Sequence, residues 1–341
     1  MPDNEKRYLS VFMDQNNKCN LRCIMCGFSD IRVKSIPKYD MPLWLFEKIA
    51  KEIFPKANYL ALSCLTEPLM TIDFYKRLDY LKVCPVPFTE IVTNGVLLDE
   101  KIITKMIEVG ISRLAISIDS HDPLIYESIR IGSKLEKVIK NIKIFNGLKK
   151  LLGSKLPALR INHVLMEMNI DKFSQFLKFV ESLEAQCIDV RTIIPIEHSG
   201  YRWQERKLFF DKVVKAREEL RQWTQETGIE DIGYLRWQYE EIILKDNSGE
   251  KIICKKPWDS IAIHANGDLM PCISWARGKV ANIADRSFED IWNSQELNRI
   301  RDEFEKERPG IDCMHCKIRV KEDGEDDYFY NMLNKLPPRK E

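Results

Sequence analysis

Over the first 195 residues, short β-rich runs alternate with stretches in which apolar residues recur at helical spacing. The runs predict six β-strands, at residues 8–13, 59–63, 88–93, 113–118, 159–165 and 187–193. The stretches between them predict helices at residues 43–53, 74–81, 99–109, 134–150 and 171–183. The last of these, DKFSQFLKFVESL, opens on Asp171, which is predicted to cap the helix.

Strands that alternate with helices predict one parallel sheet with right-handed crossovers. Such a sheet is either open and doubly wound or curled into all or part of a barrel. In both forms, ligands bind at the C-terminal ends of the strands. We therefore expect the functional residues in the loops that follow the strands.

The pattern changes after residue 195. Residues 207–227, KLFFDKVVKAREELRQWTQET, predict one long amphipathic helix. From about residue 251 the chain predicts short strands and turns, with a hairpin around Asn266 and Gly267. The segment after residue 321 is highly charged and is predicted to pack loosely.

Charge and composition exclude several classes of partner. The 53 basic and 52 acidic residues nearly cancel, so bulk charge predicts neither a nucleic-acid nor a membrane partner. The N-terminus MPDNEKR has no apolar signal region behind it, and no segment approaches the length of a membrane span. We expect a cytoplasmic protein, in which ten cysteines serve as metal ligands and buried thiols rather than disulfides.

Three cysteines fall within eight residues directly after the first predicted strand, in KCNLRCIMCGF. Structural zinc takes four protein ligands, and a [4Fe–4S] cluster is normally held by four thiolates. Cys19, Cys23 and Cys26 leave one position open, which is the usual mark of a site that binds a reactant. Three isolated cysteines between this group and those of the last quarter of the chain are predicted to be small buried side chains: Cys64, Cys84 and Cys187.

The spacing Cys-x3-Cys-x2-Cys after a first strand resembles the radical S-adenosylmethionine (SAM) superfamily. The resemblance covers residues 8–195 and implies an α/β fold, a partial (β/α)6 TIM-like barrel. It implies that the open iron chelates the amino and carboxylate groups of SAM. One electron then cleaves SAM to methionine and a 5′-deoxyadenosyl radical, which takes a hydrogen atom from the substrate. An electron donor of the flavodoxin or ferredoxin type is implied as well.

Companion motifs follow the later strands. Glu67-Pro68 matches the end of the family's Gly-Gly-Glu-Pro, although Leu65 and Thr66 replace the glycines. Thr93-Asn94-Gly95 resembles its TNG turn, and Ser117-Ile118-Asp119 its S-x-D segment. Taken singly, each is ordinary for a turn or a surface charge. Together the resemblance assigns SAM binding to Glu67 (ammonium), Arg130 (methionine carboxylate), Thr93, Asn94, Ser117 and Phe28.

A second set of cysteines lies in the last quarter of the chain, at Cys254, Cys272, Cys313 and Cys316. Four cysteines could complete a zinc site. Their order, with a G-x4-C and an IWNS element, resembles the auxiliary-cluster extension called SPASM in its shorter "twitch" form. The resemblance implies a second [4Fe–4S] cluster with every corner filled by protein, suited to accept an electron from the substrate radical. It divides the chain into a core (1–200), a helical connector (201–250), an auxiliary domain (251–320) and a charged tail (321–341).

These observations favour a radical SAM oxidoreductase that dehydrogenates a small polar metabolite such as a sugar or aminocyclitol. Because the cluster loop begins at residue 19, we expect no N-terminal peptide-recognition domain. The alternatives are a peptide- or protein-modifying enzyme that oxidises, cross-links or epimerises its substrate, and a zinc-binding scaffold without radical chemistry. Predicted substrate contacts follow the sixth strand: Glu197, His198, Tyr201 and Arg202. Candidate bases are His163, Arg160, Arg191 and His198, and Cys64 or Cys187 could donate hydrogen from a thiol.

Overall fold

The computed structural model describes residues 7–30, 33, 35–63, 65–193, 206–233, 252–275, 277–306 and 320–321. Its centre is a parallel sheet in which consecutive strands are neighbours, in the order β1 to β7. The strands are β1 (Leu9–Met13), β2 (Ala57–Ala61), β3 (Phe88–Thr93), β4 (Arg113–Ser117), β5 (Ala158–Leu165), β6 (Cys187–Thr192) and the short β7 (Glu230–Asp231). All six predicted strands are present, and the predicted partial TIM-like barrel is confirmed.

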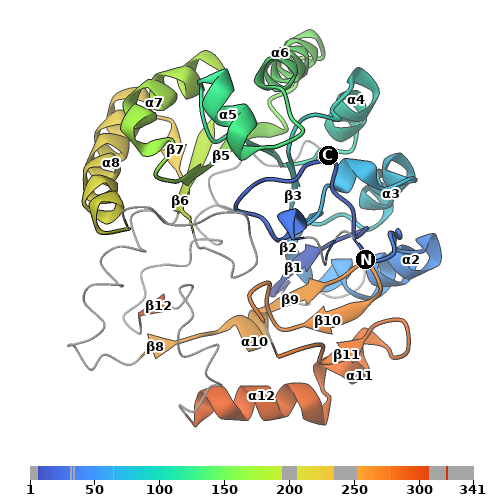
Figure 1. Cartoon of the computed structure of the whole chain (residues 1–341). Coiled ribbons are helices and arrows are strands. Elements are labelled where there is room, and N and C mark those ends of the chain that lie inside the picture. Colours follow the sequence, from blue (N-terminus) through green and yellow to red (C-terminus); the bar gives the residue numbers. More distant parts are fainter. Residues whose placement is uncertain are drawn as a thin grey trace.

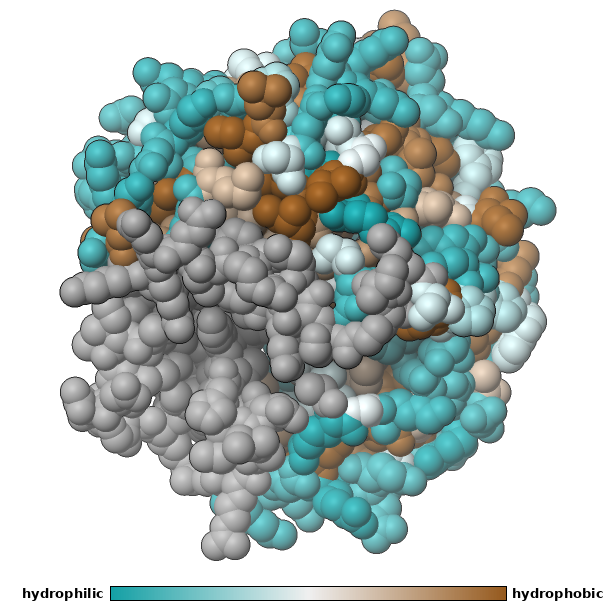
Figure 2. Space-filling view, viewed as in Figure 1, coloured by the Kyte–Doolittle hydropathy of each residue, from teal (hydrophilic) through white to brown (hydrophobic). Residues whose placement is uncertain are grey.

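Helices cover the outer face of this sheet and form an arc around it (Figure 1). They are α2 (Leu43–Glu52), α3 (Phe74–Val83), α4 (Glu100–Glu108), α5 (Pro123–Ile129), α6 (Leu135–Leu151), α7 (Phe173–Ser182) and α8 (Arg206–Thr227). Asp99 caps α4, since its side chain accepts a hydrogen bond from the Ile102 amide. Figure 2 shows polar residues over much of the visible surface, with apolar residues between them. Within the described part of the chain, no helix is both long and apolar enough to cross a bilayer.

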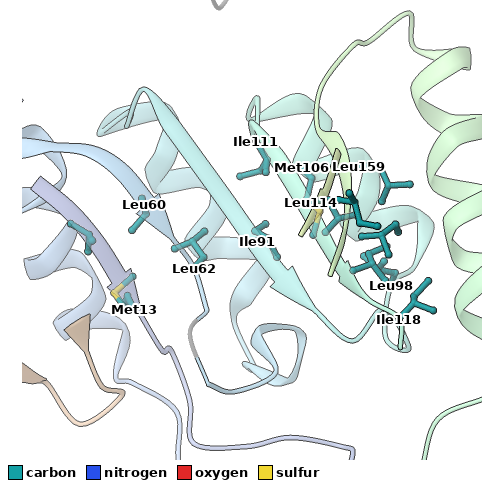
Figure 3. Packing of buried hydrophobic residues seen from close by; sticks show 14 of the residues in the cluster. Met13, Leu60, Leu62, Ile91, Leu98, Met106, Ile111, Leu114, Ile118 and Leu159 are labelled. Atoms are coloured by element: carbon teal, nitrogen blue, oxygen red, sulfur yellow. The ribbon is translucent and has the colours of Figure 1, made fainter. Parts of the chain in front are cut away.

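The apolar core lies between the sheet and these helices. Ile91, Leu114 and Leu159 stand side by side on neighbouring strands and are fully buried. Met106 of α4 belongs to the same cluster (Figure 3). Burial of each such side chain stabilises the fold by about 1.5–3 kcal/mol.

Three local predictions were incomplete or wrong. Asp171 does not cap a helix: it lies in the 3-10 turn Ile170–Lys172, and α7 begins at Phe173. Helix α5 was not predicted separately from α6; the chain leaves the helix at Arg130, and Gly132 with φ +97° turns it into the next one. Strand β7 was also missed, because two residues carry no periodicity.

The C-terminal region extends the same sheet. Strand β9 (Ser260–Ile263) pairs in parallel with β1, so that Val11 lies opposite Ile261. β10 (Asp268–Met270) and β11 (Ala281–Asn282) follow in antiparallel order. The predicted hairpin at Asn266 and Gly267 is therefore confirmed. Helices α10 (Lys256–Asp259), α11 (Phe288–Trp292) and α12 (Gln295–Glu305) pack beside it (Figure 1).

A separate two-stranded sheet joins the two ends of this region. β8 (Ile252–Ile253) pairs with β12 (Val320–Lys321), and Ile253 lies opposite Val320. Cys254 directly follows β8. The pairing therefore brings the segment that follows the last predicted cluster cysteine beside the first one.

Candidate functional site

The loop that carries Cys19, Cys23 and Cys26 follows β1 at the C-terminal edge of the sheet. Cys23 is buried, while Cys19 and Cys26 are partly exposed. The Cys26 amide donates to the Cys23 carbonyl at 3.0 Å, which closes a tight turn between the second and third cysteines. The loop is also tied to the next strand's loop, because the Glu67 amide donates to the Lys18 carbonyl at 2.9 Å.

The donor set fits an iron–sulfur cluster better than a single ion. Among the described residues, no three His, Cys, Asp or Glu side chains converge on one point as a zinc ion requires. Each thiolate of a [4Fe–4S] cluster binds a different iron, so its ligands need no common point. Burial raises the pKa of Cys19 to about 11, so binding a metal there must displace a proton.

Glu67 links the second and third strand loops. Its Oε1 accepts hydrogen bonds from Thr93 Oγ1 (2.7 Å) and the Leu69 amide (3.2 Å), and its Oε2 accepts one from the Asn94 amide (2.9 Å). The side chain is 2% exposed, and burial raises its pKa although these hydrogen bonds oppose the shift. A carboxylate has about four acceptor positions, so about one remains for a ligand. The structure thus gives Glu67 a positioning role that the sequence did not reveal.

Asp14 holds the loop before Glu67, in which Leu65 and Thr66 stand where the family has glycines. Its Oδ1 accepts hydrogen bonds from the Leu65 amide (3.1 Å), the Thr66 amide (3.2 Å) and Thr66 Oγ1 (2.9 Å). Ser63 Oγ donates to the Thr66 carbonyl at 2.7 Å. Asp14 was not predicted, although its place directly after the first strand was the available signal.

The Thr93–Asn94–Gly95 turn contacts the cysteine loop through Asn94. Asn94 Nδ2 donates to Asn20 Oδ1 at 2.8 Å, and Asn94 Oδ1 accepts from the Val96 amide at 3.0 Å. Gly95 has φ +77°, a conformation that side chains other than glycine rarely adopt. Three predicted SAM-binding residues, Glu67, Thr93 and Asn94, are therefore joined in one hydrogen-bonded unit beside the cysteines.

Arg130 lies between the fourth strand and the cysteine loop. Its Nε donates to Asp119 Oδ2 at 2.7 Å, and its Nη1 lies 3.8 Å from Cys23 Sγ. Burial alone would lower the pKa of Arg130, but the Asp119 carboxylate raises it. Ser117 ends β4 and is partly exposed, as is Phe28, which has the Lys38 ammonium 5.8 Å from its ring centroid.

The inner face of the sheet is lined by charged side chains. Glu90 on β3 accepts hydrogen bonds from Arg113 on β4 and from Arg160 on β5. Asp189 on β6 is 3% exposed and holds Arg191, whose side chain is about half exposed, through both of its carboxylate oxygens. Both candidate bases on this face, Arg160 and Arg191, are thus cations held in ion pairs.

His163 and Cys187 are poor candidates for contact with a substrate. The His163 ring lies 4.0 Å from that of Phe176, on the helix side of the sheet. Burial lowers its pKa to about 4, so the ring is neutral. Cys187 is the first residue of β6, at the end of the strand opposite to the ligand edge.

Of the second cysteine set, the structure describes Cys254 and Cys272. Both are partly buried; Cys254 lies before β9 and Cys272 after β10. The predicted residues that lie outside the described ranges are Cys64, Glu197, His198, Tyr201, Arg202, Cys313 and Cys316. Their roles stay predictions.

Comparison with protein families supports this architecture from the sequence side. Residues 16–180 match the radical SAM superfamily, and residues 254–317 match the iron–sulfur cluster-binding domain SPASM. Together these matches span about two thirds of the chain. This chain belongs to the radical SAM superfamily. The expected cofactors of this radical SAM enzyme are therefore [4Fe–4S] clusters and SAM.

Curated relatives of this radical SAM enzyme include GTP 3′,8-cyclases. A probable GTP 3′,8-cyclase of Methanocaldococcus jannaschii is 23% identical over 273 residues, which cover 77% of this chain and 84% of that protein. The GTP 3′,8-cyclase of Listeria monocytogenes is 28% identical over 208 residues. There the match covers 59% of this chain and 58% of the relative, so this chain spans little more than half of that protein.

Solved structures with the same fold include two proteins whose structures hold peptides. Streptococcus suis SuiB bound to its precursor peptide SuiA has a TM-score of 0.67 at 16% identity, covering 91% of this chain and 70% of SuiB. Native anSMEcpe with bound AdoMet and a Cp18Cys peptide has a TM-score of 0.66 at 17% identity, covering 96% of this chain and 94% of that one. At these identities the likeness shows the fold alone.

Proposed function

We propose that this radical SAM enzyme oxidises a residue of a peptide or protein substrate. The observation that carries the proposal is the extent of the structural match to anSMEcpe in its peptide complex. It runs through the core and the C-terminal region alike and covers nearly the whole of both chains. SuiB with its precursor peptide supports the same substrate class. The sequence had favoured a small polar metabolite, and the GTP 3′,8-cyclases among the curated relatives keep a small molecule as the alternative substrate class.

Three groups of residues in this chain would have separate roles in the reaction. Cys19, Cys23 and Cys26 would hold the cluster that binds SAM, and the unit built on Glu67 would orient the methionine end of SAM. The four C-terminal cysteines, two of them outside the described residues, would hold the auxiliary cluster. The chemistry that these groups supply when bound is removal of a hydrogen atom from the substrate and acceptance of the electron left behind.

The inner face of the sheet would receive the reacting residue. Arg191 lies near the C-terminal end of β6, and Asp189 restrains its guanidinium through two carboxylate contacts.

The test compares three classes of substrate in one assay. Anaerobically reconstituted enzyme receives dithionite, SAM and one of three probes: a library of cysteine- and serine-containing peptides, GTP, or an aminocyclitol. The readouts are the yield of 5′-deoxyadenosine above the probe-free background and the mass of the probe. We expect only the peptide library to raise the yield, and the responsive peptide to lose two hydrogens.

A response to GTP alone would overturn the proposal in favour of the chemistry named for the curated relatives. A response to the aminocyclitol alone would restore the small-molecule hypothesis. The triple substitution of Cys19, Cys23 and Cys26 to Ala should abolish 5′-deoxyadenosine formation with every probe. The matched variant Cys84→Ala changes a partly exposed thiol at the end of α3 and should retain it.

A further inference from the structure

Cys23 lies directly opposite Arg130 in a short stretch of paired backbone. The Arg22 amide donates to the Ile131 carbonyl at 2.9 Å, and the Ile24 amide donates to the Ile129 carbonyl at 3.0 Å. These two hydrogen bonds flank Cys23 on one segment and Arg130 on the other. The backbone therefore fixes the distance between the second cysteine and the end of α5.

The Arg130 side chain is fixed as firmly as its backbone. Asp119 is fully buried, and its Oδ2 accepts from Arg130 Nε at 2.7 Å while its Oδ1 accepts from the Val164 amide at 2.9 Å. Asn169 Nδ2 holds the Asp119 carbonyl at 2.8 Å. If the guanidinium moved away, it would leave a buried carboxylate unpaired, which is costly.

Arg130 has a different relation to its cysteine from that of the other arginine in this region. Its Nη1 lies 3.8 Å from Cys23 Sγ, within reach of a weak hydrogen bond to sulfur. The Arg22 side chain instead donates from Nη1 to two backbone oxygens, those of Cys19 at 2.8 Å and Leu21 at 2.6 Å. Arg130 thus contacts the side chain of a predicted cluster ligand, whereas Arg22 contacts only the backbone of the loop.

We propose that Arg130, positioned by Asp119, donates a hydrogen bond to the Cys23 thiolate and thereby raises the reduction potential of the cluster held by the cysteine loop. Reduction adds one electron and no proton, so the reduced cluster carries more negative charge. A positive donor at one of its sulfurs stabilises that state more than the oxidised one. This role differs from binding the methionine carboxylate, because it operates with no SAM bound.

The effect of Arg130 on the cluster does not depend on which substrate the enzyme uses. The proposal concerns the enzyme before substrate or SAM is added, so it stands or falls whether the substrate is a peptide, GTP or a small metabolite. It uses the cluster that the superfamily assignment implies, and it assigns Asp119 a positioning role one step removed from the sulfur.

The experiment is a potentiometric titration of reconstituted, SAM-free enzyme with dithionite, followed by electron paramagnetic resonance. The signal that changes when SAM is added afterwards identifies the cluster of the cysteine loop. Arg130→Gln should disfavour reduction by about tenfold, which is a negative shift of about 59 mV for one electron. Asp119→Glu keeps the negative charge but changes where the carboxylate holds the guanidinium, and it should shift the potential in the same direction. The control Arg22→Gln should leave it unchanged.

Two results would overturn the proposal. One is a wild-type potential in Arg130→Gln together with weaker SAM binding, which would leave only the carboxylate role. The other is an equal shift in Arg22→Gln, which would mean that any change in the loop alters the potential. Iron and sulfide are counted in every variant. If Arg130→Gln fails to take up its cluster, Asp119→Glu decides, because it keeps both charges and changes only where the carboxylate holds the arginine; a wild-type potential there would refute the positioning.

Discussion

The two faces of the sheet bury neighbouring residues of opposite character, apolar on the helix face and charged on the inner face. On β3, Ile91 is fully buried among the helices, and Glu90, the residue before it, is 2% exposed on the inner face. Ile91 needs only apolar neighbours of suitable size, which many sequences supply. Glu90 needs Arg113 and Arg160 in defined positions, because a buried charge without partners is strongly destabilising.

The contrast between the two faces indicates where function resides in this fold. The helix face tolerates exchange among apolar residues and carries stability. The inner face leads to the loops that hold Cys23, Glu67 and Asn94, and its side chains are held by directional contacts. We therefore expect substitutions on the inner face to affect both stability and chemistry, and those on the helix face to affect stability alone.

The largest expected effect is that of Glu90→Gln. It removes one charge and leaves two buried arginines without their carboxylate, so unfolding in urea at neutral pH should show a loss of about 3–5 kcal/mol. Ile91→Val is the matched change on the other face and should cost about 0.5–1.5 kcal/mol. Equal losses in the two variants would contradict the comparison.

The same pair of variants has a pH signature. Burial alone would raise the pKa of Glu90, but Arg113 and Arg160 hold it below the ordinary value. A carboxyl group with a lowered folded-state pKa adds stability above its unfolded-state pKa and loses that contribution as the pH falls through the folded-state value. The gap between wild type and Glu90→Gln should therefore narrow below about pH 4.5, whereas the gap for Ile91→Val should not depend on pH.

A smaller effect is expected where the ligand edge touches the helix face. A Cβ on Gly95 would lie 2.9 Å from Ile116 Cγ2 and 3.1 Å from Val138 Cγ1, in addition to the strain of φ +77°. Gly95→Ala should cost about 2–4 kcal/mol by urea unfolding. Gly153→Ala has a similar φ of +61° with nothing within 4 Å, so it should cost only the strain, about 1–2 kcal/mol. If both variants lose the same amount, the steric contact is negligible.

The smallest effect concerns His163 on the helix side. Its pKa of about 4 means that the folded protein takes up this proton later than the unfolded chain does as the pH falls. Stability should therefore fall between pH 7 and pH 5.5, by about 1 kcal/mol from this residue. In His163→Gln that part of the slope should disappear from urea titrations at the two pH values. An unchanged slope would mean that the pKa of the ring is the same in the folded protein and in the unfolded chain.

Local patterns were enough to locate most of the core. Phe88–Thr93 was predicted at its exact bounds, since a β-rich run between turns has one plausible period. The cysteine spacing and the placement of Glu67, Thr93 and Asn94 together could be predicted, because motif residues stand in fixed places after strands. Each of these motifs spans only a few residues of sequence.

Long-range pairings escaped prediction. The contact of Asp14 with Thr66 spans 52 residues, and the sequence around either residue contains no signal that identifies its partner. Arg130 was assigned to the SAM carboxylate because the family pattern names one contact, while its ion pair with Asp119 depends on how α5 ends. His163 was considered as a base because a sequence does not reveal which side of a strand faces the helices.

The pairing of β1 with β9 has a consequence for the order in which the chain folds. Residue 11 can find its neighbour at residue 261 only after most of the polypeptide has left the ribosome. Until then one edge of β1 offers unpaired amides and carbonyls to any other extended chain, which invites aggregation. The pairing of β1 is thus completed late in synthesis. We expect premature termination before residue 260 to leave an aggregation-prone fragment rather than a smaller active enzyme.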